Sequence, residues 1–125
     1  MKKMKKSIMI LALILFSFIL ISSSKAIDIS QCADLNIANS TYYVTTNFTN
    51  TTKNRCLYIT ASNITLDCQN YLITGSTSND GIYVGANNVT VKNCVLNSWQ
   101  YAIDLYNSGN HTIINNTVTG STDGI

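Results

Sequence analysis

Short blocks in which apolar and polar residues alternate recur along the chain from residue 56 onward. The segment 56–59 (CLYI) matches 81–84 (GIYV), 102–105 (AIDL) and the pair 124–125 (GI), at steps of 25, 21 and 22 residues. Each block begins with a small residue or Cys and continues with an apolar residue, a polar residue or Tyr, and a second apolar residue. A fixed step of this length is typical of repeat architectures, in which each repeat packs on its neighbours.

Two further apolar stretches follow within each repeat. Residues 63–66 (NITL) match 88–91 (NVTV), with 111–114 (HTII) as a looser third copy, and a third stretch recurs at 72–75, 95–97 and 118–120. Three short strands in a coil of about 22 residues predict an all-β chain folded as a parallel β-helix.

Alternation within each strand turns every second side chain toward the interior. We therefore expect two buried columns from the first block and a third and fourth from the second block. One coil alone cannot bury such a face, so its stability comes from the neighbouring coils. The expected columns are Leu57, Ile82 and Ile103; Ile59, Val84 and Leu105; Ile64 with Val89; and Leu66 with Val91.

Turn residues separate the predicted strands. Asn-Asp-Gly and Thr-Asp-Gly place Asp80 and Asp123 at matching turns, and Asn93 and Asn116 are expected at equivalent positions after the second strand, where side-chain amides can stack between coils. A β-sandwich would instead require hairpin signals such as Asn-Gly at regular intervals, and the sequence has none.

The N-terminal segment differs from the repeat and predicts export. Four Lys residues precede an apolar run from 8 to 21, and Ser24-Lys25-Ala26 offers small residues for cleavage, so residues 1–26 are predicted to be a signal peptide. An uncleaved anchor is the alternative, although a membrane span needs about 20 apolar residues. Residues 27–55 are then expected to form a cap or incomplete first coil, and 56–125 the regular coils of a longer helix that continues beyond Ile125.

Without the signal segment the chain is acidic. Three basic residues remain against six Asp, so the net charge is 3 − 6 = −3. So few Lys and Arg side chains disfavour binding to nucleic acid or to an anionic membrane, and contact with the membrane is expected only through the signal segment during export.

The repeat resembles the right-handed β-helix of pectin-lyase-like proteins. It is similar in particular to exported, Cys- and Asn-rich β-helix proteins of archaea and bacteria, including NosD-like periplasmic proteins. The segments 64–68 (ITLDC), 89–94 (VTVKNC) and 113–117 (IINNT) carry this resemblance. It implies the fold and little about activity, because one fold hosts many functions.

All four Cys residues follow the signal segment, which in an exported protein favours disulfides. Cys32 and Cys56 are 24 residues apart, and Cys68 and Cys94 are 26 apart, each close to one coil. Residues one coil apart lie about 4.8 Å from each other, so these two pairs are predicted to be bonded. Buried free thiols at Cys68 and Cys94 are the alternative. No CxxC pair occurs, so neither a metal site nor any cofactor is expected.

The candidates for catalysis are weak. Asp80 and Asp123 are predicted in one column about 10 Å apart with Tyr101 between them, and Asp104 is predicted to face outward. Asp is common in turns, and the paired Asp, Gly-His-Gly and Arg-Ile-Lys motifs of galacturonase-like enzymes are missing. His111 is the only His, is expected at the turn position of Asn63 and Asn88, and cannot form a copper site alone.

Outward aromatic residues are candidates for contact with sugars. Tyr58 and Tyr83 are predicted to stack, with three more aromatics nearby, although such pairs also form in ordinary cross-strand packing. The candidate set is Tyr58, Tyr83, Trp99, Tyr101 and Tyr106.

Seven Asn residues stand in Asn-X-Ser/Thr sequons, where an exported chain can be glycosylated. An Asn- and Thr-rich chain also produces sequons by chance. The acceptor candidates are Asn39, Asn47, Asn50, Asn63, Asn88, Asn110 and Asn115.

Two functions remain open from the sequence. The first is a secreted or cell-surface β-helix with a structural or adhesive role, contacting a polysaccharide or cell-surface glycan and lacking catalysis. The second is the N-terminal part of a polysaccharide lyase or glycoside hydrolase whose catalytic coils lie beyond residue 125.

Overall fold

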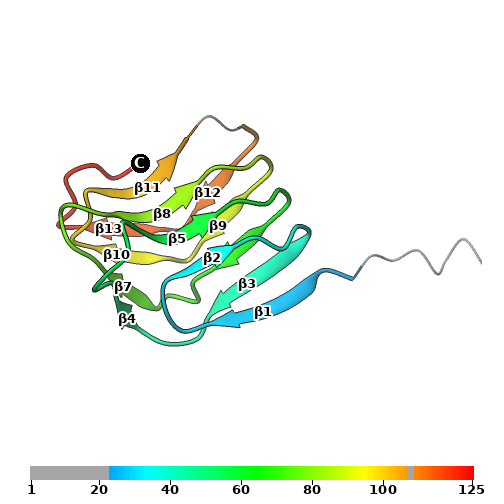
Figure 1. The fold of residues 1–125 in the computed structure, drawn as a ribbon, viewed down its shortest axis with the longest axis horizontal. Coiled ribbons are helices and arrows are strands. Elements are labelled where there is room, and N and C mark those ends of the chain that lie inside the picture. Colours follow the sequence, from blue (N-terminus) through cyan, green and yellow to red (C-terminus); the bar gives the residue numbers. More distant parts are fainter. Residues whose placement is uncertain (1–22, 107–108) are drawn as a thin grey trace, which may run out of the picture.

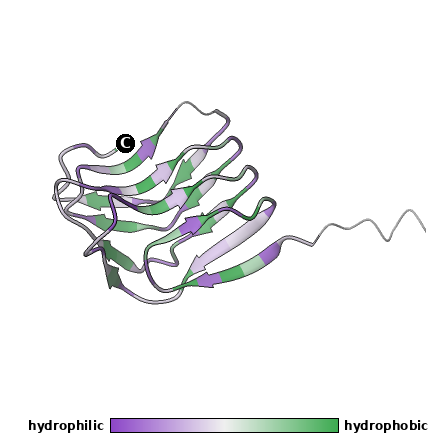
Figure 2. Ribbon diagram, viewed as in Figure 1, coloured by the Kyte–Doolittle hydropathy of each residue, from purple (hydrophilic) through white to green (hydrophobic). Residues whose placement is uncertain are grey.

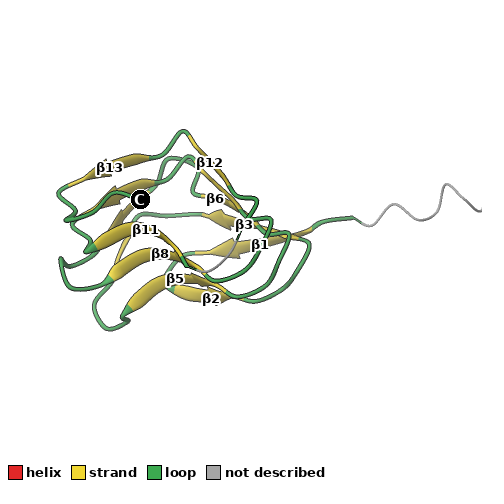
Figure 3. Ribbon diagram, turned by 90° about the horizontal axis from the view of Figure 1, so that it is seen from above, coloured by secondary structure: helices red, strands yellow, loops and turns green. Residues whose placement is uncertain are grey.

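The computed structural model describes residues 23–106 and 109–125, which form strands and loops without a helix (Figure 3). Composition explains this preference, because β-branched and aromatic residues fill the strands while Asn, Ser, Asp and Gly fill the turns. The strands are β1 (Lys25–Ile29), β2 (Ala33–Leu35), β3 (Ser40–Val44), β4 (Phe48–Thr49), β5 (Arg55–Ile59), β6 (Thr65–Asp67), β7 (Leu72–Thr74), β8 (Asp80–Val84), β9 (Thr90–Lys92), β10 (Val95–Asn97), β11 (Tyr101–Leu105), β12 (Thr112–Ile114) and β13 (Thr117–Thr119).

The strands form three parallel sheets that run along one axis (Figure 1). Their orders are β1-β3-β6-β9-β12, β4-β7-β10-β13 and β2-β5-β8-β11. The chain visits each sheet once per coil, so β3 to β5 form one coil, β6 to β8 the next and β9 to β11 the third. The predicted parallel β-helix is therefore confirmed. β3 and β4 belong to these sheets and lie within the segment 27–55, for which the sequence left a cap or an incomplete first coil open.

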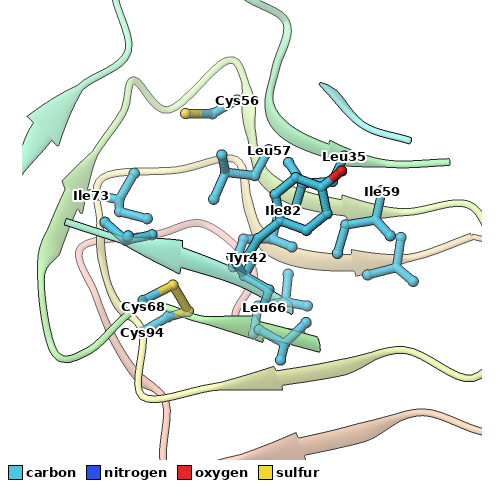
Figure 4. Packing of buried hydrophobic residues seen from close by; sticks show 14 of the residues in the cluster. Leu35, Tyr42, Cys56, Leu57, Ile59, Leu66, Cys68, Ile73, Ile82 and Cys94 are labelled. Atoms are coloured by element: carbon cyan, nitrogen blue, oxygen red, sulfur yellow. A yellow bond between two sulfur atoms is a disulfide. The ribbon is translucent and has the colours of Figure 1, made fainter. Parts of the chain in front are cut away.

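The interior columns lie where the alternation placed them. Leu57 pairs in register with Ile82, which pairs with Ile103, and all three side chains are fully buried. Figure 2 shows apolar residues in the strands of all three sheets, and the apolar side chains labelled in Figure 4 meet in the interior. Leu105 differs, because β11 is the edge strand of its sheet in the described chain and leaves this side chain 39% exposed.

Trp99 is a buried corner residue, and the expectation that it faces outward was wrong. Its side chain is fully buried, and the indole Nε1–H donates a hydrogen bond to the carbonyl of Ile73 at 3.2 Å. Gly75 and Gly81 provide the space, because a Cβ at Gly81 would lie 3.1 Å from the indole and one at Gly75 would overlap it. A large ring between two sheets therefore depends on two positions without side chains.

The third copy of the second block is shifted by one residue from the predicted alignment. Thr112 pairs with Thr90, so Asn110 is the counterpart of Asn88, and His111 is not. Asn115 is likewise the counterpart of Asn93, and both have positive φ, of 54° and 56°.

Asn116 therefore does not stack on Asn93. Its Oδ1 accepts a hydrogen bond from the amide of Cys94, and its Nδ2 donates to the carbonyl of Val91. The side chain of Asn93 bonds instead to Asp67. The short Asn side chain carries both a donor and an acceptor, so it can bond either to the backbone or to another side chain. The sequence pattern does not distinguish these two roles.

A column of Asn residues turns the chain into the first sheet of each coil. Asn39, Asn63, Asn88 and Asn110 all have left-handed backbone conformations, with φ between 56° and 62°. Asn tolerates this region better than other residues with a side chain. Asn63 Nδ2 also donates to Asn39 Oδ1 across one coil at 3.1 Å.

Both predicted disulfides are confirmed. Cys32 bonds to Cys56 and Cys68 to Cys94, with Cα atoms 4.5 Å and 4.6 Å apart. The second pair lies in the interior view of Figure 4. Each bond links two adjacent coils, as the one-coil spacing of the Cys residues predicted.

The predicted signal segment lies almost entirely outside the described residues, and its cleavage stays a prediction. Lys25 and Ala26 are the first two residues of β1 and pair with Ser40 and Thr41. Within residues 23–106 and 109–125 there is no helix of the length and hydropathy that a membrane crossing requires.

Asp67 carries the best-satisfied carboxylate of the described chain. It accepts hydrogen bonds from the amide of Gln69 and from Asn93 Nδ2, both at 3.0 Å, and Lys92 Nζ lies 3.3 Å from Oδ2. Burial favours the neutral acid, but the bonds from Asn93, Gln69 and Lys92 outweigh it and hold the pKa of Asp67 below its ordinary value.

We expect Gly75→Ala to destabilise the chain by about 1–3 kcal/mol, because the added methyl group overlaps the Trp99 ring and the corner is closely packed. Urea unfolding with intact disulfides measures this loss. Gly109→Ala is the matched control, since no described atom beyond its chain neighbours lies within 4 Å of its added Cβ, and it should change stability by less than about 0.5 kcal/mol. Equal effects of the two substitutions would contradict the corner packing.

We expect Asp67→Asn to cost about 1–2 kcal/mol at neutral pH, because three donors lose an ionised acceptor. A depressed folded-state pKa stabilises the fold above the unfolded value of about 3.9, and this contribution disappears as pH falls through the folded-state pKa. Unfolding curves of the wild type and the variant should therefore converge in acid. Asp28→Asn, on the exposed part of β1, should leave the pH profile unchanged.

Candidate functional site

The outer face of the β2-β5-β8-β11 sheet gathers aromatic and charged side chains from three coils. Register sets this arrangement, because Tyr58 pairs with Tyr83 and Tyr83 with Asp104. These strands lie side by side in Figures 1 and 3. Residues 21 to 25 positions apart in sequence are thereby brought to adjacent strands of one surface.

Three Tyr rings form a continuous aromatic surface. The Tyr58 and Tyr83 rings meet edge to face with centroids 5.3 Å apart, and the Tyr106 ring lies 5.7 Å from that of Tyr83. Tyr83 is only 6% exposed because its neighbours cover it, whereas Tyr106 is 61% exposed. Tyr58 and Tyr83 lie one coil apart in the same column, as predicted, although their rings meet edge to face, and Tyr106 extends the aromatic surface.

Arg55 covers the centre of this aromatic surface. Its guanidinium carbon lies 3.6 Å from the centroid of the Tyr83 ring and 5.0 Å from that of Tyr58. The geometry is that of a cation–π contact, worth about 0.5–1 kcal/mol at an exposed site. Arg55 Nε also lies 3.9 Å from Asp80 Oδ2.

The carboxylate of Asp80 responds to its surroundings on this surface. Partial burial raises the pKa of Asp80, the negative charge of Asp104 raises it further, and the Arg55 guanidinium opposes both effects. Burial also raises the pKa of the Tyr83 phenol, so Tyr83 remains a neutral hydroxyl and can donate a hydrogen bond.

These side chains line a hollow of about 610 Å³, which we call the tyrosine hollow. A second hollow of about 540 Å³ shares two of the same residues, Arg55 and Asp80, and continues the surface toward Lys53 and Gln100. The tyrosine hollow is lined by Arg55, Tyr58, Asp80, Tyr83, Gly85, Asp104 and Tyr106. The two hollows therefore adjoin at Arg55 and Asp80, and their lining carries several hydrogen-bonding groups.

The other predicted site residues lie apart from the tyrosine hollow. Tyr101 pairs with both Asp80 and Asp123, so the predicted column exists, yet neither Tyr101 nor Asp123 lines either of the two hollows. Asp80 is influenced by Asp104 rather than by Asp123.

Arg55 lines the tyrosine hollow, and sequence reasoning did not identify it. It precedes the first block, and its in-register partner is Asp80. The signal was present in the repeat, because an Arg one position before CLYI aligns with the Asp one position before GIYV.

The sequon residues differ in their accessibility. Asn50 is 7% exposed, donates through Nδ2 to the Lys53 carbonyl at 2.6 Å and accepts from the amides of Thr52 and Lys53. Its amide is therefore held within a turn of the folded chain. Asn47 is exposed, but its Oδ1 accepts from the Leu72 amide. The remaining five take left-handed turn conformations: Asn39, Asn63, Asn88, Asn110 and Asn115.

No group of three potential metal ligands occurs among residues 23–106 and 109–125. His111 Nδ1 accepts a hydrogen bond from the amide of Val89, which gives this side chain a structural role. Comparison with protein families, with curated proteins and with solved structures finds no match. The surface chemistry of the β-helix is therefore the basis for assigning a function.

We expect Asp104→Asn to lower the pKa of Asp80, because it removes a neighbouring negative charge while leaving the burial of Asp80 in place. Carboxyl-carbon NMR titration of the wild type and the variant measures the change. Asp28→Asn, on a different sheet, should leave the titration of Asp80 unchanged. An Asp80 titration that is identical in all three proteins would show that the two carboxylates do not interact.

Proposed function

We propose that this chain is an exported β-helix module that binds glycans through the tyrosine hollow and has a structural or adhesive role. The observation that carries the proposal is the combination of three Tyr rings with charged hydrogen-bonding groups in one hollow. Sugar rings present apolar C–H faces bordered by hydroxyls, and sites of this chemistry combine aromatic surfaces with a few placed polar groups.

The rigidity of the scaffold supports binding. The rings of Tyr58 and Tyr83 stand on adjacent in-register strands, so the backbone fixes their separation. A surface ordered before binding loses little conformational entropy when a ligand arrives. The exposed ring of Tyr106 remains free to contact a ligand.

Export is part of the proposal. The N-terminal pattern of residues 1–26 and the two disulfides agree with an extracytoplasmic location, since disulfides persist in oxidising compartments. The repeat motifs also agree with the resemblance to exported pectin-lyase-like and NosD-like β-helix proteins. Glycosylation at the accessible sequons would fit the same location.

A carbohydrate-active enzyme is the second candidate. The observation that favours it is the raised pKa of Asp80 beside Asp104, since paired carboxylates with different environments serve as acid and base in glycoside hydrolysis. Release of reducing ends from a polysaccharide, lost in Asp80→Asn, would favour this candidate over a binding module.

We expect Tyr106→Ala to weaken retention on the bound polysaccharide by about fivefold or more, because it removes the most exposed ring of the hollow. Affinity electrophoresis of the whole chain through gels that contain different polysaccharides measures retention. Tyr43→Ala is the matched control, because Tyr43 lies on β3 in a different sheet. Equal loss in both variants, or no retention on any polysaccharide, would contradict the proposal.

A further inference from the structure

The tyrosine hollow holds more negative charge than positive charge. Its lining includes the carboxylates of Asp80 and Asp104 and the single guanidinium of Arg55. At neutral pH these groups sum to −2 + 1 = −1. The rings of Tyr58, Tyr83 and Tyr106 line the same hollow.

The guanidinium of Arg55 already contacts other groups of the protein. One face of its guanidinium lies on the Tyr83 ring at 3.6 Å, and its Nε faces Asp80. An incoming carboxylate would therefore compete with Asp80 and approach Asp104 as well. Uronic acids are poorly matched to such a surface.

Asp104, by contrast, makes no salt bridge with any residue of the described chain. Its position in register with Tyr83 places it beside the aromatic surface. A cation bound here would meet one unpaired carboxylate, a second carboxylate at Asp80 and the exposed face of Tyr106. Carboxylates and aromatic rings together are the groups that bind ammonium ions.

We propose that the ligand of the tyrosine hollow is a polysaccharide that carries protonated amino sugars rather than uronic acids. This inference rests on the proposed glycan-binding function and names the substrate class for the same site. The amino group lies against Asp104 and Asp80, and the sugar ring lies against Tyr106. The adjoining hollow, which shares Arg55 and Asp80, receives the neighbouring sugar of the polymer.

The test compares three oligosaccharides of equal length by calorimetry with the whole chain, in a mildly acidic buffer that keeps amino groups protonated. The probes are a glucosamine oligomer, its fully N-acetylated form and an oligogalacturonate. We expect the glucosamine oligomer to bind about fivefold more tightly than the acetylated form, the upper range for one charge pair at a surface, and the oligogalacturonate to bind most weakly.

Substitutions at Asp104 attribute this preference to the hollow. Asp104→Asn should remove the preference for the unacetylated oligomer, whereas Asp104→Glu, which keeps the charge, should retain it. Asp28→Asn removes one negative charge from a different sheet and should leave the preference intact. Loss of preference in Asp28→Asn would point to overall charge and would overturn the inference.

The remaining outcomes distinguish failure of the amino-sugar assignment from failure of glycan binding. Equal affinity for acetylated and unacetylated oligomers, with Tyr106→Ala weakening both, overturns the amino-sugar assignment and leaves glycan binding intact. Failure of all three oligosaccharides and of the polysaccharides tested by electrophoresis overturns glycan binding itself. Capture of polylysine through Asp104 with no saccharide bound overturns both, because the hollow would then bind basic peptides.

Discussion

The structure depends on one constraint: the main-chain amides and carbonyls of each coil form hydrogen bonds with those of the neighbouring coils, at the spacing of parallel strands. Every interior column follows from that register, because a shift of one residue would move the apolar side chains to the outer face. The pairing of Leu57, Ile82 and Ile103 shows the result, since three residues from three coils fill one buried line. The outer columns follow from the same register.

The surface chemistry is therefore determined by which residues recur one coil apart. Tyr58 and Tyr83 meet because their strands are in register, and Arg55 reaches Asp80 for the same reason. A parallel β-helix can in this way build a site from single residues of successive repeats, with little contribution from its loops. The tyrosine hollow is such a site: five of its seven lining residues belong to β5, β8 and β11, and Gly85 and Tyr106 directly follow β8 and β11.

The fold was predictable from the sequence because alternation and repeat length both act locally and regularly. The disulfides were predictable for the same reason, since Cys residues one coil apart must be neighbours. The misalignment of His111 and Asn116 arose where apolar residues are adjacent, as in Ile113-Ile114, and alternation alone leaves the register open by one residue. The left-handed conformations of Asn93 and Asn115 mark the two as equivalent positions and fix this register.

The site was less predictable than the fold. The position of Trp99 near a turn gives no signal for an inward or outward side chain, and it was expected to face outward. Its burial depends on the absence of side chains at Gly75 and Gly81, which makes room for the ring. The contact of Arg55 with Tyr83 depends on the direction of a long side chain across strands, which strand alternation does not specify. Sequence patterns thus identify which residues share a face, whereas the mutual approach of side chains needs coordinates.

Two joints between adjacent coils of the described chain carry no disulfide: the joint between the coil of β3 to β5 and the coil of β6 to β8, and the joint between the coil of β9 to β11 and the strands β12 and β13. Cys32–Cys56 ties the β1–β2 segment to the coil of β3 to β5, and Cys68–Cys94 ties the coil of β6 to β8 to that of β9 to β11. The coil of β3 to β5 and the coil of β6 to β8 are joined by the main chain, by strand pairing and by side-chain contacts, and the tyrosine hollow lies across this joint. A ligand that contacts residues on both sides of this joint would hold the two coils together reversibly. The solenoid would then resist unfolding more strongly as a larger fraction of the hollows is occupied.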